Sequence, residues 1–182
     1  MTPQLVKAGW AGRNGWTNSS NFPTHQLHEQ LASERANVST VQAMFILIVG
    51  SGRVGSAVAK RALDAGHEVS VLDSDPLSHE RLDKDQLTTW EDAGGRFTVS
   101  TALEIDGLIE AGIEQADVFV AATSGDNTNL VIAQIAQRRF KVRRVVVRVA
   151  DPGRAAWYAE QGLLTICPTQ VAIDEASRVV LA

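Results

Sequence analysis

The stretch MFILIVGSGRVGSAVAKRALDAGHEVSVLDSD, residues 44–75, decides the fold predicted for this chain. An apolar run meets the hexapeptide GSGRVG, a segment of helical periodicity follows, and a second apolar run ends in Asp73. A glycine turn with a purely structural role is one interpretation. The strand pattern, the helix and the acidic strand end all fall within one βαβ length, however, which favours a nucleotide site.

The three glycines of the hexapeptide have different predicted roles. Gly50 lets the chain turn sharply out of the strand, and Gly55 lets the helix pack closely on it. Gly52 has no side chain that would hold a pyrophosphate away from the backbone. The unpaired N–H groups and the positive dipole end of the helix then face the phosphates.

Two charged side chains bear on which nucleotide is bound. Asp73 lies 23 residues after Gly50, near the spacing at which a carboxylate reaches a ribose hydroxyl. A carboxylate there would repel a 2′-phosphate, so NADP is disfavoured, while NAD(H) and ATP or ADP remain open. Arg53 is predicted to meet phosphate oxygens from the helix N-terminus, the alternative being a solvated arginine.

Composition limits the class of protein. The chain has 182 residues, enough for one good core, and a net charge of −4 with both signs mixed, which gives no reason to expect nucleic-acid binding. Its apolar runs are shorter than the roughly 18 residues that cross a bilayer, so no direct membrane insertion is expected. The single cysteine, Cys167, fits a reducing compartment and is expected to be a buried core thiol.

Residues 1–43 differ from the rest of the chain. They are polar, show no sustained period and have no apolar stretch of signal-peptide type, and their pattern allows a short helix around residues 24–36. We interpret them as a dispensable, disordered extension. The alternative is a tail whose Trp10, Trp16 and Phe22 dock on a partner.

From Met44 onward the sequence alternates between strand and helix patterns. Gly66 is a predicted helix stop, and Asp151–Pro152 is a predicted helix start. Such alternation predicts an α/β fold, a Rossmann-like doubly wound parallel sheet of about six strands covered on both faces. The predicted strands are 45–50, 68–73, 96–100, 117–122, 144–149 and 163–167, and the predicted helices are 53–65, 76–90, 102–111, 127–139 and 153–161.

A last helix, 169–181, has no strand after it. Its apolar residues recur at helical spacing, so it is either a crossover helix that pairs two copies of the chain or a helix that folds back on the core. These residues are Ala172, Ile173, Ala176, Val179 and Val180.

The ends of the fourth and fifth predicted strands carry further candidates. Ala122, Thr123 and Ser124 would line a nucleotide with little steric bulk, because ligands of open α/β sheets lie beyond the carboxyl ends of the strands. A charge inside a buried strand needs a partner, so Arg148 is predicted to face the nucleotide or a subunit interface. Asp126 can cap the next helix, and Asp126, Asn127 and Asn129 are either ligand contacts or parts of an ordinary capped loop.

A catalytic apparatus is not readable in the sequence. His25, His28, His67 and His79 show no pairing that suggests metal or triad chemistry, and a Ser/His/Asp arrangement is missing. We therefore predict that the chain is not an enzyme. The alternatives are a small NAD-dependent oxidoreductase and a structural partner whose nucleotide site is empty.

Residues 44–182 resemble the N-terminal nucleotide-binding domain of the TrkA/KtrA-type potassium-uptake regulators, called the RCK or KTN domain. The similarity rests on ILIVGSGRVGSAVA, GHEVSVLDSDP, LIEAGIEQADVFVAATSGDNTNL, RRVVVRVADPGRAAWYAEQGL and the closing ICPTQVAIDEASRVV. The family usually has a Gly-Asp pair where this chain has Ser100–Thr101, so an adenine-side contact at Thr101 and Ala102 is the weakest part of the match. Many relatives also continue into a second, ligand-sensing domain.

The resemblance implies residue roles and a function. The implied phosphate loop is Gly50, Ser51, Gly52, Arg53, Val54 and Gly55, with Asp73 and Ser74 at the ribose and Thr123, Ser124 and Arg148 beside the nucleotide. It also implies a cytoplasmic, nucleotide-sensing regulatory subunit, peripheral at the inner face of the cell membrane. Such a subunit would gate a TrkH/KtrB-like potassium transporter and form a homo-oligomer, at least a dimer.

Overall fold

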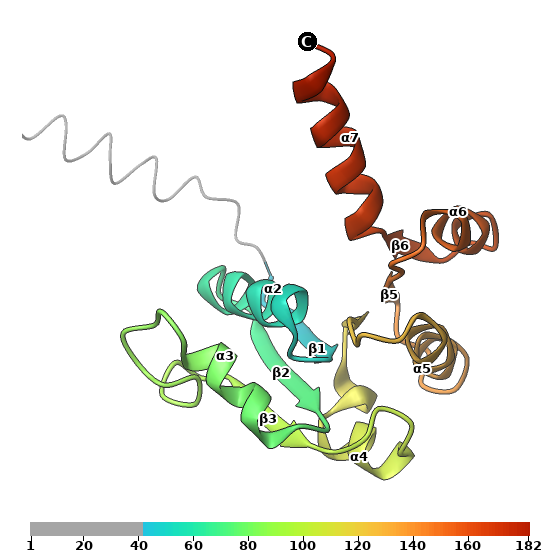
Figure 1. Ribbon diagram of the computed structural model, residues 1–182. Helices are drawn as coiled ribbons and strands as arrows, with labels where there is room; N and C mark the ends of the chain where they lie inside the picture. Colours follow the sequence, from blue (N-terminus) through green and yellow to red (C-terminus); the bar gives the residue numbers. More distant parts are fainter. Residues whose placement is uncertain (1–41) are drawn as a thin grey trace, which may run out of the picture. The chain divides into compact units, whose positions relative to one another are not determined.

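Six parallel strands form one sheet in the part of the chain that the computed structural model describes, residues 42–182 (Figure 1). The strand order is β3-β2-β1-β4-β5-β6, so the order of connection reverses between β1 and β4, as in a doubly wound sheet. This confirms the predicted fold class. The strands are β1 (Phe45–Val49), β2 (Glu68–Asp73), β3 (Arg96–Val99), β4 (Val118–Ala121), β5 (Arg144–Arg148) and β6 (Leu164–Ile166).

Alternating side chains of the central strand supply two cores. In β1, Ile46 and Ile48 face one layer of helices, while Leu47 and Val49 face the other, and all four are buried. The first layer contains α2 (Arg53–Asp64) and α3 (Glu80–Asp83). The second contains α4 (Ile105–Glu110), α5 (Asp126–Arg138) and α6 (Pro152–Glu160). Burial on both faces explains why the central strands are continuous apolar runs.

Local signals set several boundaries as expected. Gly66 ends the α2 region with a φ of 84°, and the Asp151 carboxylate caps α6 by accepting a hydrogen bond from the Arg154 N–H, with Pro152 at the first helical position. The predicted and observed strands differ by at most one residue at either end, and the bounds of β2 agree.

The predicted helix 76–90 is wrong in its second half. The structure has a 3₁₀ turn, η1 (Pro76–His79), followed by the short α3, and then an irregular segment in which Asp85 has a φ of 62°. Trp90 is the physical reason, because this residue is only 2% exposed in the core. Its backbone N–H donates to the Asp83 carboxylate at 2.8 Å, and its indole N–H donates to the Arg96 carbonyl at 3.1 Å. Burying that ring takes the chain out of the helix. The predicted helix 102–111 also begins later, at Ile105, and is followed by η2 (Ile113–Gln115).

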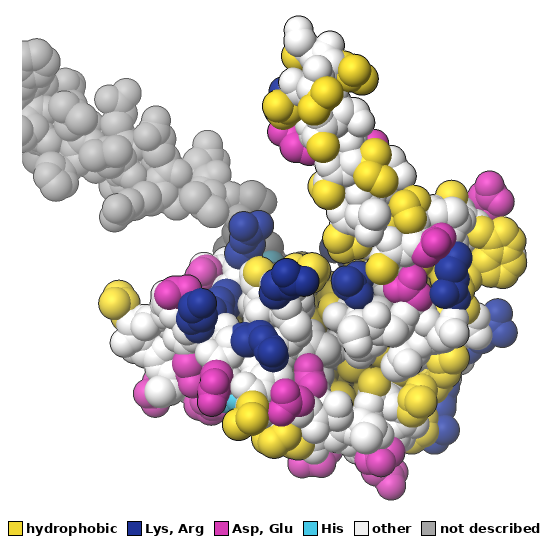
Figure 2. Space-filling model, viewed as in Figure 1, with side chains coloured by type: hydrophobic (Ala, Val, Ile, Leu, Met, Phe, Trp, Pro, Cys, Tyr) yellow, Lys and Arg dark blue, Asp and Glu magenta, His cyan; other side chains and the backbone are white. Residues whose placement is uncertain are grey.

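The last helix, α7 (Pro168–Val180), does not fold back on the core. Within the described part of the chain, every residue from Thr169 to Ala182 is exposed, and Figure 2 shows hydrophobic side chains along α7. Cys167 also differs from its prediction as a buried core thiol. It is half-buried, and its Sγ accepts a hydrogen bond from the Gln170 N–H at 3.4 Å at the start of α7.

Two expectations concern residues that lie mostly outside the described part of the chain. The interpretation of residues 1–43 as a dispensable extension, and the short helix at 24–36, fall on residues that, apart from 42 and 43, are outside the described ones. Among residues 42–182, no helix combines the length and the apolar character needed to span a bilayer.

Candidate nucleotide-binding site

A cavity of about 350 Å³ opens beyond the carboxyl ends of β1, β2 and β4. This is the switch point of the sheet, where two neighbouring connections leave in opposite directions and expose a crevice. The side chains and backbone around it come from four loops. The cavity is lined by Val49, Gly50, Gly52, Arg53, Leu72, Asp73, Ser74, Asp75, Ser78, Arg81, Ala102, Ala122, Thr123 and Ser124.

Two of the three loop glycines are required by close packing. Gly50 has a φ of 105°, and a Cβ on it would lie 2.7 Å from the backbone N of Thr123. A Cβ on Gly55 would lie 1.8 Å from the carbonyl oxygen of Gly50, so the start of α2 can approach the loop only without a side chain. These two glycines build the loop.

Gly52 is different from the other two glycines. It has an ordinary φ of −73°, and a Cβ built on it would meet no atom of the described residues within 4 Å. It lines the cavity as the residue before the first turn of α2. The packing of the described residues therefore does not require glycine here, which is what we expect if the space belongs to a ligand.

Asp73 holds the glycine loop and the start of η1 together. One carboxylate oxygen accepts from the Ser51 N–H at 2.6 Å, and the other accepts from the Asp75 N–H at 3.0 Å. The carboxylate is half-buried and lines the cavity. A ribose hydroxyl could donate to lone pairs that these backbone groups leave free.

A network around Asn129 holds the β4 side of the cavity. The Asn129 side chain is fully buried, accepts from the Thr123 N–H at 2.9 Å, and donates to the carbonyl oxygens of Thr123 and Arg148. Arg148 donates from Nη1 to the Thr123 carbonyl at 2.9 Å. Asn129 thus has a positioning role that the sequence left open. The Arg148 guanidinium binds the Thr123 backbone and is not among the residues that line the cavity, and its predicted role at the nucleotide or at a subunit interface stays a prediction.

Asp126 does not cap α5 with its side chain. Gly125 occupies the N-cap position, and Asp126 begins the helix. The Asp126 carboxylate instead accepts hydrogen bonds from the N–H groups of Ala150 and Asp151, at 2.8 and 3.2 Å. These hydrogen bonds link the start of α5 to the loop after β5, and the residues that they join are 24 and 25 positions apart in the sequence.

Most of the predicted contacts lie at the cavity, and the others lie around it. The lining includes eight of them, namely Gly50, Gly52, Arg53, Asp73, Ser74, Ala102, Thr123 and Ser124. Five predicted residues lie outside the lining, namely Ser51, Val54, Gly55, Thr101 and Arg148. Ser51 and Gly55 shape the loop from beneath, since both are buried.

Sequence reasoning missed the wall that follows β2. Ser78 and Arg81 line the cavity three residues apart, on η1 and α3. Arg81 reaches the Ser51 carbonyl with Nη1 at 3.5 Å, and the Ser78 hydroxyl is buried without a hydrogen-bond partner among residues 42–182. The i, i+3 spacing in a helical segment directly after Asp73 was the available signal. With Arg53, the lining offers two guanidiniums, and Asp73 and Asp75 offer two carboxylates.

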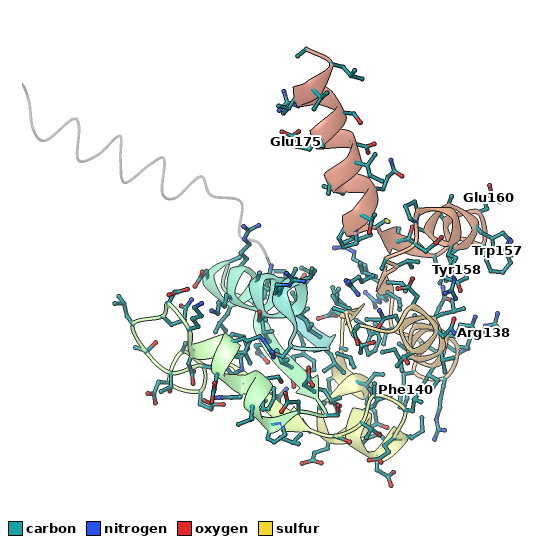
Figure 3. The ribbon with its side chains drawn as sticks, in the orientation of Figure 1. Arg138, Phe140, Trp157, Tyr158, Glu160 and Glu175 are labelled. Atoms are coloured by element: carbon teal, nitrogen blue, oxygen red, sulfur yellow. The ribbon has the colours of Figure 1, made fainter. Side chains whose placement is uncertain are left out.

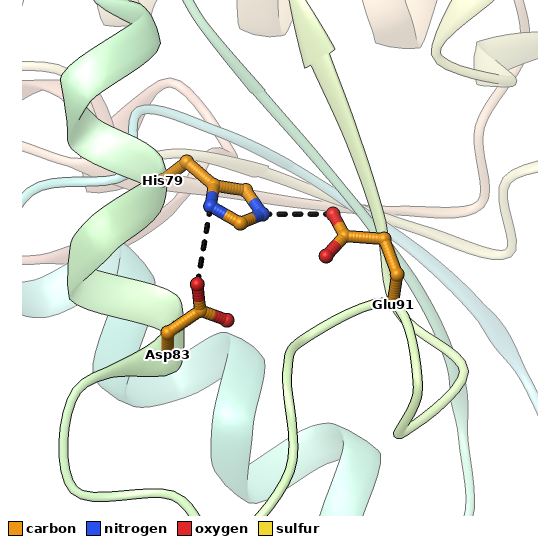
Figure 4. Close-up of side chains that lie close together, drawn as sticks. All are labelled: His79, Asp83 and Glu91. Atoms are coloured by element: carbon orange, nitrogen blue, oxygen red, sulfur yellow. Dashed lines mark hydrogen bonds and ion pairs between the residues drawn. The ribbon is translucent and has the colours of Figure 1, made fainter.

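A separate cluster departs from the expectation that no histidine pairs with metal-binding or catalytic groups. His79 lies between two carboxylates, Asp83 on α3 and Glu91 in the turn after Trp90 (Figure 4). The partners are four and twelve residues away. A search for residues at helical spacing cannot find the pairing with Glu91, because it is twelve residues from His79 in the sequence.

The fold and the loop define the chain as a Rossmann-type domain with a glycine loop at its switch point. The TrkA-N domain family model matches residues 46–167. The chain is 40% identical over 135 residues to the Trk system potassium uptake protein TrkA of Streptomyces coelicolor, covering 74% of this chain and 57% of that protein. It is 32% identical over 114 residues to TrkA of Mycobacterium tuberculosis, covering 63% and 48%. The chain belongs to the TrkA-N domain family.

Solved structures agree on the fold. The TrkA-N domain of the inner membrane protein ybaL from Escherichia coli matches with a TM-score of 0.61 and 17% identity, covering 78% of this chain and 97% of that one. The AMP-bound C-terminal domain of Kef from Shewanella denitrificans matches with a TM-score of 0.60 and 22% identity, covering 75% and 80%. The chain spans about half the length of the curated relatives it matches.

Asp73 provides a test of the ribose assignment. We expect Asp73→Ala to weaken the binding of NAD or ATP by about 1–3 kcal/mol, the range for a hydrogen bond to a charged group, and to relax the discrimination against NADP. Because Asp73 also holds the glycine loop, Asp73→Asn is the matched variant, since it removes the charge but keeps one acceptor oxygen. Calorimetric titration measures both effects. Unchanged affinities for all three ligands in both variants would exclude Asp73 from the ribose site.

Proposed function

We propose that the chain is a nucleotide-binding regulatory module for potassium uptake. The single observation that carries this proposal is the cavity at the switch point, where Gly52 leaves space that the packing of residues 42–182 does not use. Membership of the TrkA-N family and relatives named as potassium uptake proteins support the direction of the proposal. A ligand that binds one assembly geometry better than another shifts the population toward that geometry, which is how such a module would act.

The proposed ligands are NAD(H) and ATP or ADP. All contain an adenosine phosphate, and the AMP named for the Kef structure shares that part. Arg53 is exposed at the first turn of α2 and lines the cavity, so it is our candidate for distinguishing ligands by phosphate charge. We expect Arg53→Ala to reduce the affinity for ATP more than that for NAD, as measured by calorimetry. Equal losses for both ligands would remove Arg53 from this role.

A regulatory role is favoured over an oxidoreductase. Hydride transfer requires a proton donor or base beside the nicotinamide and a pocket for the substrate. Among the described residues, the titratable groups that line the cavity are Arg53, Asp73, Asp75 and Arg81. The carboxylates of Asp73 and Asp75 each already accept a hydrogen bond from a backbone N–H group. Turnover of NAD with candidate substrates in a spectroscopic assay would reverse this preference.

We further propose a homo-oligomer, at least a dimer, formed through α7. Ile173 is 47% exposed and Val179 is 64% exposed, and an isolated helix with such a face gains by burying it. Figure 3 shows Trp157 on α6 also pointing outward, and this side chain is 56% exposed. Sedimentation equilibrium of the full chain tests this proposal. Ile173→Glu should shift the protein toward the monomer, whereas Asp174→Glu, a neighbouring change, should not.

Potassium uptake tests the function as a whole. The proposed partner is a TrkH/KtrB-like potassium transporter, which the module would contact at the cytoplasmic face of the cell membrane. In a strain that lacks its own regulator, expression of this chain should change potassium uptake, and the Gly52→Val variant should fail to do so normally. Normal control of uptake by that variant would contradict nucleotide-dependent regulation.

A further inference from the structure

The strongest feature outside the nucleotide cavity is the cluster of His79, Asp83 and Glu91 (Figure 4). One ligand atom from each side chain lies within 4.8 Å of the others. His79 and Asp83 are on consecutive turns, four residues apart, and Glu91 comes from the irregular segment that follows. The cluster therefore joins η1 and α3 to the turn after Trp90.

The side chains of His79 and Asp83 are each held in place by a neighbouring residue, and each keeps one atom that could bind a metal ion. The Asp83 Oδ1 atom accepts from the Trp90 N–H at 2.8 Å, so Oδ2 is the atom that faces His79. The His79 ring packs edge-on against Phe97, with ring centroids 5.1 Å apart. Both groups are thus oriented before any ligand binds, as in a preorganised site.

The two nitrogens of His79 have different environments. Nε2 lies 2.8 Å from Glu91 Oε1, a normal hydrogen-bond length that places the proton on Nε2 in the neutral ring. Nδ1 is then a lone-pair donor, and it faces the lone pairs of Asp83 Oδ2 at 3.4 Å. Two such atoms repel each other unless a cation or a second ring proton lies between them.

The separation of these atoms fits a shared metal ion. Two ligand atoms at about 2.0–2.1 Å from a tetrahedral ion are about 3.4 Å apart. The third side chain fits as well, because a metal-binding histidine usually donates its other N–H to a carboxylate. The exposed fractions of His79, Asp83 and Glu91 are 27%, 38% and 53%, so water can complete the coordination.

We propose that His79 Nδ1 and Asp83 Oδ2 bind a divalent transition-metal ion of the Zn²⁺ type, with Glu91 as the positioning residue for the imidazole. Imidazole nitrogen with carboxylate oxygen is a donor set that Zn²⁺ accepts, and the two carboxylates balance the charge of the ion. With two protein ligands the site is a weak one, in contrast to structural Zn²⁺ sites, which have four protein ligands.

Calorimetric titration of the full chain with ZnCl₂ tests the site, in a His25→Gln/His28→Gln background that removes two other imidazoles. We expect His79→Gln and Asp83→Asn to weaken one Zn²⁺ site by at least about 10-fold, and Glu91→Ala to weaken it by about 10-fold, the range for loss of a positioning carboxylate. Asp83→Asn keeps an oxygen for the Trp90 N–H, so the fold is preserved. His67→Gln is the control and should leave the isotherm unchanged.

Two results would overturn the proposal. One is that the cluster binds no Zn²⁺. This would be seen as a parent protein that takes up no Zn²⁺ below about 1 mM, or as three cluster variants that give the same isotherm as the parent. The other is that His79 only forms ion pairs with Asp83 and Glu91. In that case the melting temperature would depend on pH, His79→Gln would remove this dependence, and Zn²⁺ would leave the melting temperature unchanged. If His79→Gln fails to fold, Glu91→Ala decides, because this residue lies on an exposed turn.

The metal site would act on the wall of the nucleotide cavity. Residues 76–83 carry His79 and Asp83, and they also carry Ser78 and Arg81, which line the cavity. An ion that fixes this segment should raise the affinity for a nucleotide, and the nucleotide should raise the affinity for Zn²⁺ by the same factor. This step rests on the proposed function. The Zn²⁺ titration is run without nucleotide, so its result stands even if the chain binds no nucleotide. If the chain binds nucleotide with an affinity that Zn²⁺ does not change, only the coupling between the two sites is refuted.

Discussion

Gly52→Val is expected to lower nucleotide affinity by at least about 100-fold, or ~3 kcal/mol, while the protein stays folded. The branched side chain would occupy the space beside the first turn of α2, where the N–H groups of Arg53 and Val54 must approach a pyrophosphate. The fold should survive because Gly52 has a φ of −73° and its added Cβ meets no described atom within 4 Å.

Calorimetry and thermal melting measure the two halves of this prediction. Gly52→Ala is the graded control, and it should cause a smaller loss of affinity because its side chain is a single methyl group. A Gly52→Val protein that melts like the parent and binds NAD or ATP as well as the parent would remove the phosphate-loop assignment. It would also leave the uptake experiment without its inactive variant.

Gly55→Ala is expected to have the opposite signature, a loss of about 3 kcal/mol or more of stability. Its Cβ would lie 1.8 Å from the Gly50 carbonyl oxygen, and that atom belongs to a loop whose other side abuts Ala122 and Thr123. Backbone on both sides leaves little room for adjustment, so α2 must move away from β1.

Urea denaturation measures the effect of Gly55→Ala. Gly153→Ala is the matched control, because Gly153 also lies in the first turn of a helix and its Cβ would approach no closer than 3.4 Å to the Asp151 carboxylate. We expect that control to change stability by less than about 1 kcal/mol, the scale of helix propensity. If Gly55→Ala and Gly153→Ala lowered the stability by the same amount, the glycine loop would be able to move and make room for the added methyl group, contrary to this prediction.

The two glycine substitutions also separate function from folding in the same hexapeptide. A loss of binding with intact stability at position 52 and a loss of stability at position 55 would together show that one glycine serves the ligand and the other serves the fold. Loss of stability in both variants would instead make the motif a packing device, which is the alternative that the sequence left open.

Periodicity and glycine placement determined the architecture from the sequence alone. The strands buried on both faces are continuous apolar runs, and residues such as Gly66 and Asp151 mark helix ends through local geometry. The glycine loop and Asp73 belong to one βαβ unit, so their approach follows from short-range connectivity. This is why Ser51 and Asp73, 22 residues apart, could be expected to meet.

Only the tertiary structure decided the contacts between distant loops. The Asn129 amide donates to the Arg148 carbonyl, and the Ala150 N–H donates to the Asp126 carboxylate. Both hydrogen bonds depend on how α5 lies against β5, and local capping rules gave Asp126 a different role. Trp90 likewise ended a helix that its periodicity favoured, because core burial of a large ring outweighs the propensity of a few turns.

The wall formed by Ser78 and Arg81 and the cluster around His79 have the same origin. Their side chains project from a segment whose helix is shorter than its pattern predicts, and the return of the chain at Glu91 completes the cluster. Sequence patterns report which residues share a face of one element, since that depends on local repeat. Which elements face each other is set by packing, and those residues therefore became visible only in the folded chain.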